Sequence, residues 1–226
     1  MLHSQSGRYN EDSREYDYEN GSSQEETNML DSKWQQGIIT SAEEMQSIVG
    51  QPHDAVVSKT VGVLDAGIER YLAMSPIFFL ASSGAGGRAD VSPRGDEPGF
   101  VKVLDERHLI FPDRMGNRRI DSLLNIADNP QVGLIFLIPG LNEVLRINGR
   151  AYVTRSEELI AAQQWRGKTT GLAVIVEVEE AFVHCPRALK QSGIWSGETW
   201  PDKETLPSTM EMFKAHLKLN GYELKE

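Results

Sequence analysis

Cysteine is almost absent from this chain. Cys185 is the only one among 226 residues, so no disulfide can form within the molecule. That usage is typical of a reducing compartment, and we expect a cytoplasmic protein. The sequence also lacks any run of about 18 apolar residues, which predicts that nothing spans a membrane. The amino terminus has no apolar stretch of the kind found in a secretory signal.

Basic charge is scarce as well. The chain has 23 Lys and Arg residues against 33 Asp and Glu residues, for a net charge of -10. Eight acidic and only three basic residues fall within residues 1–33, which therefore carry half of the net charge. Neither this segment nor the rest has the basic surface of a nucleic-acid-binding protein, so we expect no such partner.

The charge pattern suggests how the chain is organised. Residues 1–36 are polar and show neither helical nor strand periodicity, which predicts a disordered acidic tail. We expect residues 37–226 to form one domain that ends in a helix. That helix should cover 209–219, with Ser208 and Glu211 as a capping box and with Met210, Phe213 and Leu217 as its apolar stripe.

Short apolar runs separated by turn residues dominate the middle of the chain. They predict strands at 77–81, 89–92, 99–104, 107–111, 132–138, 143–154 and 172–183. Helices are expected from about Thr40, with Met45, Ile48 and Val49 buried, and then at 65–75, 118–127 and 156–165. Many short strands with few separated helices predict a mainly β protein, an antiparallel barrel with helical insertions.

The segment 111–124 carries the strongest functional signal. A strand is expected to end at Phe111 and a helix to begin after Asn117, a good N-cap residue. An apolar stripe of Ile120, Leu123, Leu124 and Ala127 would pack that helix on the core.

Three arginines surround the start of this expected helix. Arg118 and Arg119 would lie in its first turn, where the helix dipole disfavours positive charge, and Arg114 would lie in the preceding loop. A bound anion would reverse that penalty, and backbone N–H groups with converging guanidinium groups make a phosphate site. Alternatively, the arginines pair with Asp113, Asp121 or other carboxylates.

This segment resembles the pyridoxamine 5′-phosphate oxidase superfamily. A Gly-Asn-Arg-Arg loop opens the helix, Asn129-Pro130 closes it before an apolar strand, and an Asn-Gly-Arg-Ala strand follows at 148–151. The likeness covers about residues 70–200, and it is closest to an uncharacterised flavin-binding branch. It implies an antiparallel split β-barrel that binds flavin mononucleotide (FMN) at a homodimer interface.

The resemblance also assigns roles to residues. Arg118 and Arg119 match the phosphate-binding pair, Asn117 matches a serine of the family loop, and Asp113 and Arg114 lie where that loop contacts the ribityl chain and ring. Arg94, in an expected rigid loop Ser92–Asp96, would approach the pyrimidine edge of the flavin or its phosphate, unless it forms only a turn with an Arg–Asp pair.

Two further side chains have open interpretations. Trp195 lies in a Gly/Ser-rich stretch and would either form a stacking lid over the flavin or pack back on the body. Arg146 would face either solvent or the cofactor. Cys185 and His184 have no metal-ligand spacing, so no metal site is expected.

These observations predict an FMN-dependent oxidoreductase acting on an unidentified small molecule. The catalytic residues are unknown, because the flavin itself carries the chemistry. Ile194–Trp200 replaces the family's Arg-x-His substrate element, which argues against pyridoxamine phosphate as the substrate. The alternatives are a non-catalytic flavin- or haem-binding protein, with His108 or His184 as haem ligand, and a deazaflavin-dependent reductase of the same fold.

Overall fold

The computed structural model describes residues 31–222, so most of the predicted tail at 1–36 lies outside the described residues. Pro52–Trp200 forms one compact unit, and the described residues on either side of it belong to a second. The second unit contains the helices α1 (Ser32–Gln35), α2 (Ala42–Val49) and α8 (Thr209–Leu219) and the short turn η2 (Lys203–Thr205). Among residues 31–222, every helix is too short or too polar to cross a bilayer.

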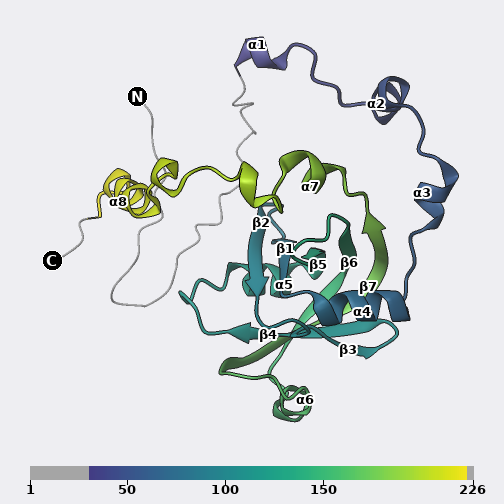
Figure 1. Cartoon of the computed structure of the whole chain (residues 1–226), viewed down its shortest axis with the longest axis vertical. Coiled ribbons are helices and arrows are strands. Elements are labelled where there is room, and N and C mark those ends of the chain that lie inside the picture. The colour runs from purple at the N-terminus through teal and green to yellow at the C-terminus, as the bar shows by residue number, and fades with distance from the viewer. Residues whose placement is uncertain (1–30, 223–226) are drawn as a thin grey trace. The chain divides into compact units, whose positions relative to one another are not determined.

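All seven strands of the larger unit form one antiparallel sheet (Figure 1). The sheet order is β2-β1-β5-β6-β7-β4-β3, so the sheet is not closed, and β2 and β3 are its edges. This is the expected mainly β architecture of a split barrel. The strands are β1 (Ile77–Ser83), β2 (Ala89–Gly95), β3 (Lys102–Asp105), β4 (His108–Arg114), β5 (Gln131–Leu137), β6 (Val144–Thr154) and β7 (Thr169–His184).

Among the helices of this unit, α5 and α6 lie in connections between strands, α3 and α4 precede β1, and α7 and η1 follow β7. Two of them, α4 and α5, contribute buried residues to the core, and α5 packs against β1, β2 and β6. The elements are α3 (Asp54–Ser58), α4 (Ala66–Met74), α5 (Asp121–Asp128), α6 (Glu157–Ala162), α7 (Arg187–Ser192) and η1 (Gly197–Thr199). The helices α1, α3 and α7 were not expected, because they are too short for a periodic signal.

Helix α4 follows its sequence signals closely. The Asp65 side chain accepts a hydrogen bond from the N–H of Ile68, and the helix ends before Pro76 as predicted. Its Tyr71 hydroxyl lies 2.9 Å from the carbonyl oxygen of Glu143 and 3.2 Å from that of Phe136. Burial raises the pKa of Tyr71, so the phenol keeps the proton with which it ties α4 to the sheet.

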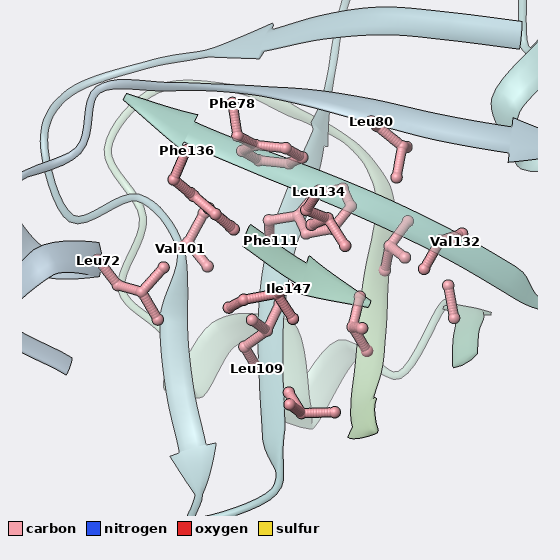
Figure 2. Packing of buried hydrophobic residues seen from close by; sticks show 14 of the residues in the cluster. Leu72, Phe78, Leu80, Val101, Leu109, Phe111, Val132, Leu134, Phe136 and Ile147 are labelled. Carbon is pink, nitrogen blue, oxygen red and sulfur yellow. The ribbon is translucent and has the colours of Figure 1, made fainter. Parts of the chain in front are cut away.

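The core fills the inside of the curved sheet (Figure 2). Phe78 lies at its centre, with ring centroids 4.9 Å from Phe111 in an edge-on contact and 4.8 Å from Phe136. These rings come from the neighbouring strands β1 and β5 and from β4, which is separated from β5 by β6 and β7 in the sheet order. The aromatic cluster therefore joins the two ends of the sheet.

A close backbone approach bends the two longest strands. The register between β6 and β7 shifts between Asn148 and Gly149, and a Cβ built on Gly149 would lie too close to the Glu177 carbonyl oxygen. Only glycine fits there, which explains the glycine within the Asn-Gly-Arg-Ala motif.

The predicted burial of the apolar stripe of α2 is wrong, and the apolar stripe of α8 is not buried either. Both helices form where expected, with Ser41 and Ser208 as capping residues. However, neither α2 nor α8 buries a residue, and the exposed side chains include Met45, Ile48, Val49, Met210 and Phe213. Amphipathic periodicity shows which face is apolar but does not show that the chain itself covers it.

Candidate functional site

A cavity of about 590 Å³ lies where the sheet fails to close. We call the gap between edge strand β2 and strand β4 the seam. The cavity wall comes from β2, the end of β4, the loop 115–120, the first turn of α5 and the start of β7. Six of the seven predicted cofactor-binding residues line it: Arg94, Asp113, Arg114, Asn117, Arg118 and Arg119.

One wall of the cavity is the inner face of β2. Asp90, Ser92 and Arg94 alternate along this strand as half-buried residues, and their partners across the ladder are the buried Ser82, Leu80 and Phe78. Because opposite residues of an antiparallel pair share a face, the inner surface turns from apolar to polar between β1 and β2.

The expectation of a rigid loop at Ser92–Asp96 is therefore wrong for most of that segment. Strand β2 continues to Gly95 and includes Pro93, which is paired with Phe79. Proline is tolerated there because β2 is an edge strand with a neighbour on one side only.

The opposite wall comes from β4, which also extends further than predicted. The strand runs to Arg114 instead of ending at Phe111, with an irregular register between Pro112 and Arg114 opposite the long strand β7. Asp113 lies at this irregularity and is 8% exposed. One of its carboxylate oxygens lies 3.2 Å from Nη1 of Arg94, and the other accepts a hydrogen bond of 2.8 Å from Thr170.

A chain of hydrogen bonds continues from Arg94 along the wall. Its Nε donates to Ser92 Oγ at 3.2 Å, Ser92 Oγ lies 3.1 Å from Ser122 Oγ, and Ser122 donates to Asp90 at 3.1 Å. Sequence reasoning missed Asp90, Ser122 and Thr170. The alternation of polar residues along 90–94 was a usable signal for Asp90, whereas the other two follow only from the fold.

Arg114 closes the seam at a second point. Its Nε lies 2.5 Å from Oδ2 of Asp96, the residue after β2, and its Nη1 donates to the carbonyl oxygen of Lys168 at 3.3 Å. The side chain is about one-quarter exposed. Arg114 therefore links β4 to the segments that follow β2 and precede β7.

The predicted start of the helix at the arginine pair is wrong. Helix α5 begins at Asp121 after Ile120, and Asn117 is not its N-cap. Arg118 has a left-handed backbone with φ of 65°, which an α-helix cannot contain, and the Asn117 side chain accepts a hydrogen bond from the Arg119 N–H. The local turn formed by Asn117 thus competes with the helix and delays it.

Because α5 begins later than predicted, the residues that it buries also differ from the predicted apolar stripe. Leu123 and Ile126 are buried, but Ile120 and Leu124 are about half exposed. The arginine pair consequently lies in the loop that borders the cavity, and the argument from a helix dipole does not apply to it.

The two arginines differ in their electrostatic surroundings. The Arg119 guanidinium pairs with the Asp121 carboxylate, as the alternative interpretation allowed, and Nη2 lies 2.9 Å from Oδ2. The side chain of Arg119 is nevertheless 74% exposed. Within residues 31–222, Arg118 has neither an ion pair nor a side-chain hydrogen bond. Arg118 is therefore the guanidinium of the cavity whose charge remains uncompensated.

Two sequence candidates lie elsewhere. Trp195 does not line the cavity, and its indole N–H donates to the carbonyl oxygen of Leu141 at 3.0 Å. Arg146 lies on β6 opposite Ile135 and Phe182, with its guanidinium carbon 5.1 Å from the Phe182 ring centroid. In the part of the chain that the structure describes, no three His, Cys, Asp or Glu side chains gather in a way that could hold a metal ion.

The fold and the cavity place the protein in the class of antiparallel barrels that are open along one seam. The cavity at this seam is polar and rich in arginine. Residues 64–185 match the model of the pyridoxamine 5′-phosphate oxidase family. This match spans more than half of the chain, and the protein belongs to that family. The helices α1, α2, α3, α7 and α8 lie outside the matched region.

Several solved structures are distantly similar to this chain. HupZ of Group A Streptococcus is 17% identical, with 54% of this chain and 99% of that chain covered and a TM-score of 0.44. A putative pyridoxamine 5′-phosphate oxidase of Lactobacillus delbrueckii is 20% identical, with 54% and 95% covered and a TM-score of 0.43. HutZ, a haem storage protein of Vibrio cholerae, is 16% identical, with 54% and 93% covered and a TM-score of 0.34. No curated protein matches the chain.

Proposed function

We propose that the protein is an FMN-dependent oxidoreductase that binds its cofactor in the cavity at the seam. The observation that carries this proposal is the convergence of four guanidinium groups on one cavity from three separate segments. They belong to Arg94, Arg114, Arg118 and Arg119. Such a density of donors suits a phosphorylated ligand.

The loop 115–120 provides the phosphate end of this site. The charge of Arg118 is uncompensated, and the exposed pair between Arg119 and Asp121 is of a kind that contributes little stability. A phosphate dianion can therefore recruit both guanidinium groups without breaking a buried interaction.

The other end of the cavity suits neutral polar groups. Arg94 and Asp113 neutralise each other, so their free donors and acceptors offer hydrogen bonds of fixed direction with little net charge. The Thr170 and Ser92 hydroxyls lie beside them. These groups fit ribityl hydroxyls and the polar edge of a flavin ring, and a cavity of about 590 Å³ has the size of sites for ligands of this class.

FMN supplies the two-electron chemistry when it is bound, and the protein supplies position and electrostatics. The residues around the cavity therefore have to bind, orient and shield the cofactor. This division of labour is consistent with the lack of a recognisable catalytic acid–base pair in the sequence.

Haem fits this cavity less well than FMN does. Neither histidine considered as an axial ligand lines it. Nδ1 of His108 lies 2.9 Å from the Asp105 carboxylate at the β3–β4 turn, and His184 is an exposed residue at the end of β7. A deazaflavin cofactor remains compatible with the same donors.

We also expect a homodimer, which the outer face of the sheet supports. Phe79 pairs with Pro93 on one side and with Ile135 on the other, and Val91 is the next outward residue along β2. These four apolar side chains are exposed on adjoining strands. A contiguous apolar face of this kind is typical of a surface that pairs with a second copy.

Purified protein titrated separately with FMN, riboflavin, a deazaflavin and haem tests the cofactor assignment. We expect FMN to quench tryptophan fluorescence at the lowest concentration and to co-elute with the protein in gel filtration. Reduction of the bound FMN by NADH or NADPH would establish the redox activity. Tighter binding of haem or the deazaflavin than of FMN would contradict the proposal.

A further inference from the structure

A second, smaller cavity of about 270 Å³ adjoins the one at the seam. Its wall comes from the connection between β2 and β3, the start of β3, and the segment between α6 and β7. Arg114 lines both cavities, and its ion pair with Asp96 forms part of the wall of the smaller one. A molecule in the smaller cavity would therefore lie next to any ligand in the larger one.

Positive charge exceeds negative charge in this second cavity. Both of its carboxylates are already paired, Asp96 with Arg114 and Glu97 with Arg166. Lys102, at the start of β3, is half-buried, and in residues 31–222 it has neither an ion pair nor a side-chain hydrogen bond. The ammonium group of Lys102 is therefore available to pair with a ligand.

The cavity also offers an apolar surface. Trp165 lines it, and the indole N–H donates to the carbonyl oxygen of Phe100 at 2.6 Å. Because its single polar atom is engaged, the indole offers only carbon to a ligand. That hydrogen bond also fixes the ring against the β2–β3 connection, which reduces the entropy lost when a ligand packs on it.

We propose that this cavity binds a small planar organic anion, with Lys102 pairing with its carboxylate and Trp165 contacting its ring. The assignment of this anion as the substrate rests on the proposed function, since it places the anion beside the flavin cavity across Arg114. A volume of about 270 Å³ admits one aromatic ring with a short substituent but not a nucleotide.

Benzoate and its neutral analogue benzamide serve as probes, with binding followed by calorimetry on protein loaded with FMN. We expect benzoate to bind at least tenfold more tightly than benzamide. Lys102→Met should weaken benzoate binding by about ten- to a hundredfold, the usual range for losing a charge-assisted contact, and leave benzamide unchanged. Trp165→Ala should weaken both probes.

Two controls locate the site. Lys168→Met removes an exposed ammonium group that does not line either cavity and should change nothing. Arg155→Gln removes an exposed guanidinium group outside both cavities and should also leave benzoate binding intact. Equal affinity for the two probes, no effect of Lys102→Met, or loss of benzoate binding in Lys168→Met or Arg155→Gln would each overturn the proposal.

The same titrations separate this proposal from the assignment of FMN. Lys102→Met should bind FMN as the unmodified protein does, because Lys102 does not line the larger cavity. If FMN binds but benzoate does not, the second site is wrong and the cofactor assignment stands. If benzoate binds through Lys102 to a protein that takes no FMN, the anion site stands and its role as substrate site is wrong.

Discussion

The guanidinium of Arg94 lies 3.2 Å from the carboxylate of Asp113 and joins two strands that share no backbone hydrogen bonds. β2 is one edge of the sheet, and β4 is next to the other edge. Both side chains are largely buried, at 21% and 10% exposed. In a closed barrel, backbone hydrogen bonds would join the strands on the two sides of the seam. Here the ion pair between Arg94 and Asp113 joins them, and the cavity lies beside this ion pair.

Replacing Arg94 by methionine should therefore destabilise the protein. The change leaves a nearly buried carboxylate on Asp113 with Thr170 as its remaining side-chain partner. We expect a loss of about 1–3 kcal/mol in the free energy of unfolding, measured by urea denaturation. Arg166→Gln is the matched control, because its ion pair with Glu97 is exposed on both sides and should contribute under about 0.5 kcal/mol. Equal losses in the two variants would show that the Arg94 pair does not hold the seam.

Among the glycines of the described residues, we expect Gly149 to tolerate an added Cβ atom least. A Cβ would overlap the Glu177 carbonyl oxygen across the bulge between β6 and β7, so one of the two longest strands would have to move. Gly149→Ala should cost about 3 kcal/mol or more in thermal or urea denaturation. Gly86→Ala, where a Cβ meets no atom within 4 Å, should be close to neutral.

Much of the fold could be predicted from the sequence, and the reason lies in local periodicity. The strands that form β1, β5, β6 and β7 and the helices α4 and α8 appear where apolar spacing and capping residues place them. Such signals depend on neighbours within about 10 residues. The predicted ends of the strands at the seam were wrong, because the end of a strand depends on partners that are distant in sequence. β4 extends to Arg114 only because β7 begins early enough to pair with it.

The candidate site illustrates the same limit. The arginines were found because several cations gather around one short loop, a local feature. Their geometry was not predictable: the left-handed Arg118 and the Asn117 turn set the start of α5, and capping rules alone placed it too early. Thr170 and Ser122 joined the site through side-chain contacts across 57 and 30 positions of sequence, which no local pattern encodes.

The acidic segment at the amino terminus should be dispensable for folding and cofactor binding. Its composition offers too little apolar surface to offset the entropy of ordering it. Deleting residues 1–30 spares α1, which starts at Ser32, and should leave the melting temperature and the FMN affinity unchanged. A fall of several degrees in the melting temperature would show that the segment packs on the folded protein.

The outer face of the sheet should mediate dimerisation. Ile135 is 40% exposed at the middle of β5, directly opposite Phe79 of β1. Placing an ammonium group there by Ile135→Lys should convert the dimer into a monomer in light scattering, because two copies of the charge would be buried against apolar surface. Met74→Lys adds the same charge at an exposed position at the end of α4 and should leave the dimer intact. A dimer that survives Ile135→Lys would place the interface elsewhere.

Arg118 provides the most direct test of where the cofactor phosphate lies. Its charge is uncompensated, whereas Arg119 already shares Asp121, so removal of Arg118 should have the larger effect. Losing one charge-assisted contact to phosphate costs about 1.5–3 kcal/mol, or about ten- to over a hundredfold in affinity. We expect Arg118→Gln to weaken FMN binding by that factor and Arg119→Gln to weaken it less.

Riboflavin has the same ring and ribityl chain without the phosphate, so neither substitution should change its affinity. Both side chains are exposed and lie before the first turn of α5, so the melting temperature should stay the same. Arg155→Gln removes an exposed guanidinium outside the cavity and controls for the change in net charge. Fluorescence titration of each variant with both flavins gives the answer. If the affinities for FMN and riboflavin fell together, the arginines would be supporting the loop or the ring, because a phosphate contact cannot affect a ligand that lacks the phosphate.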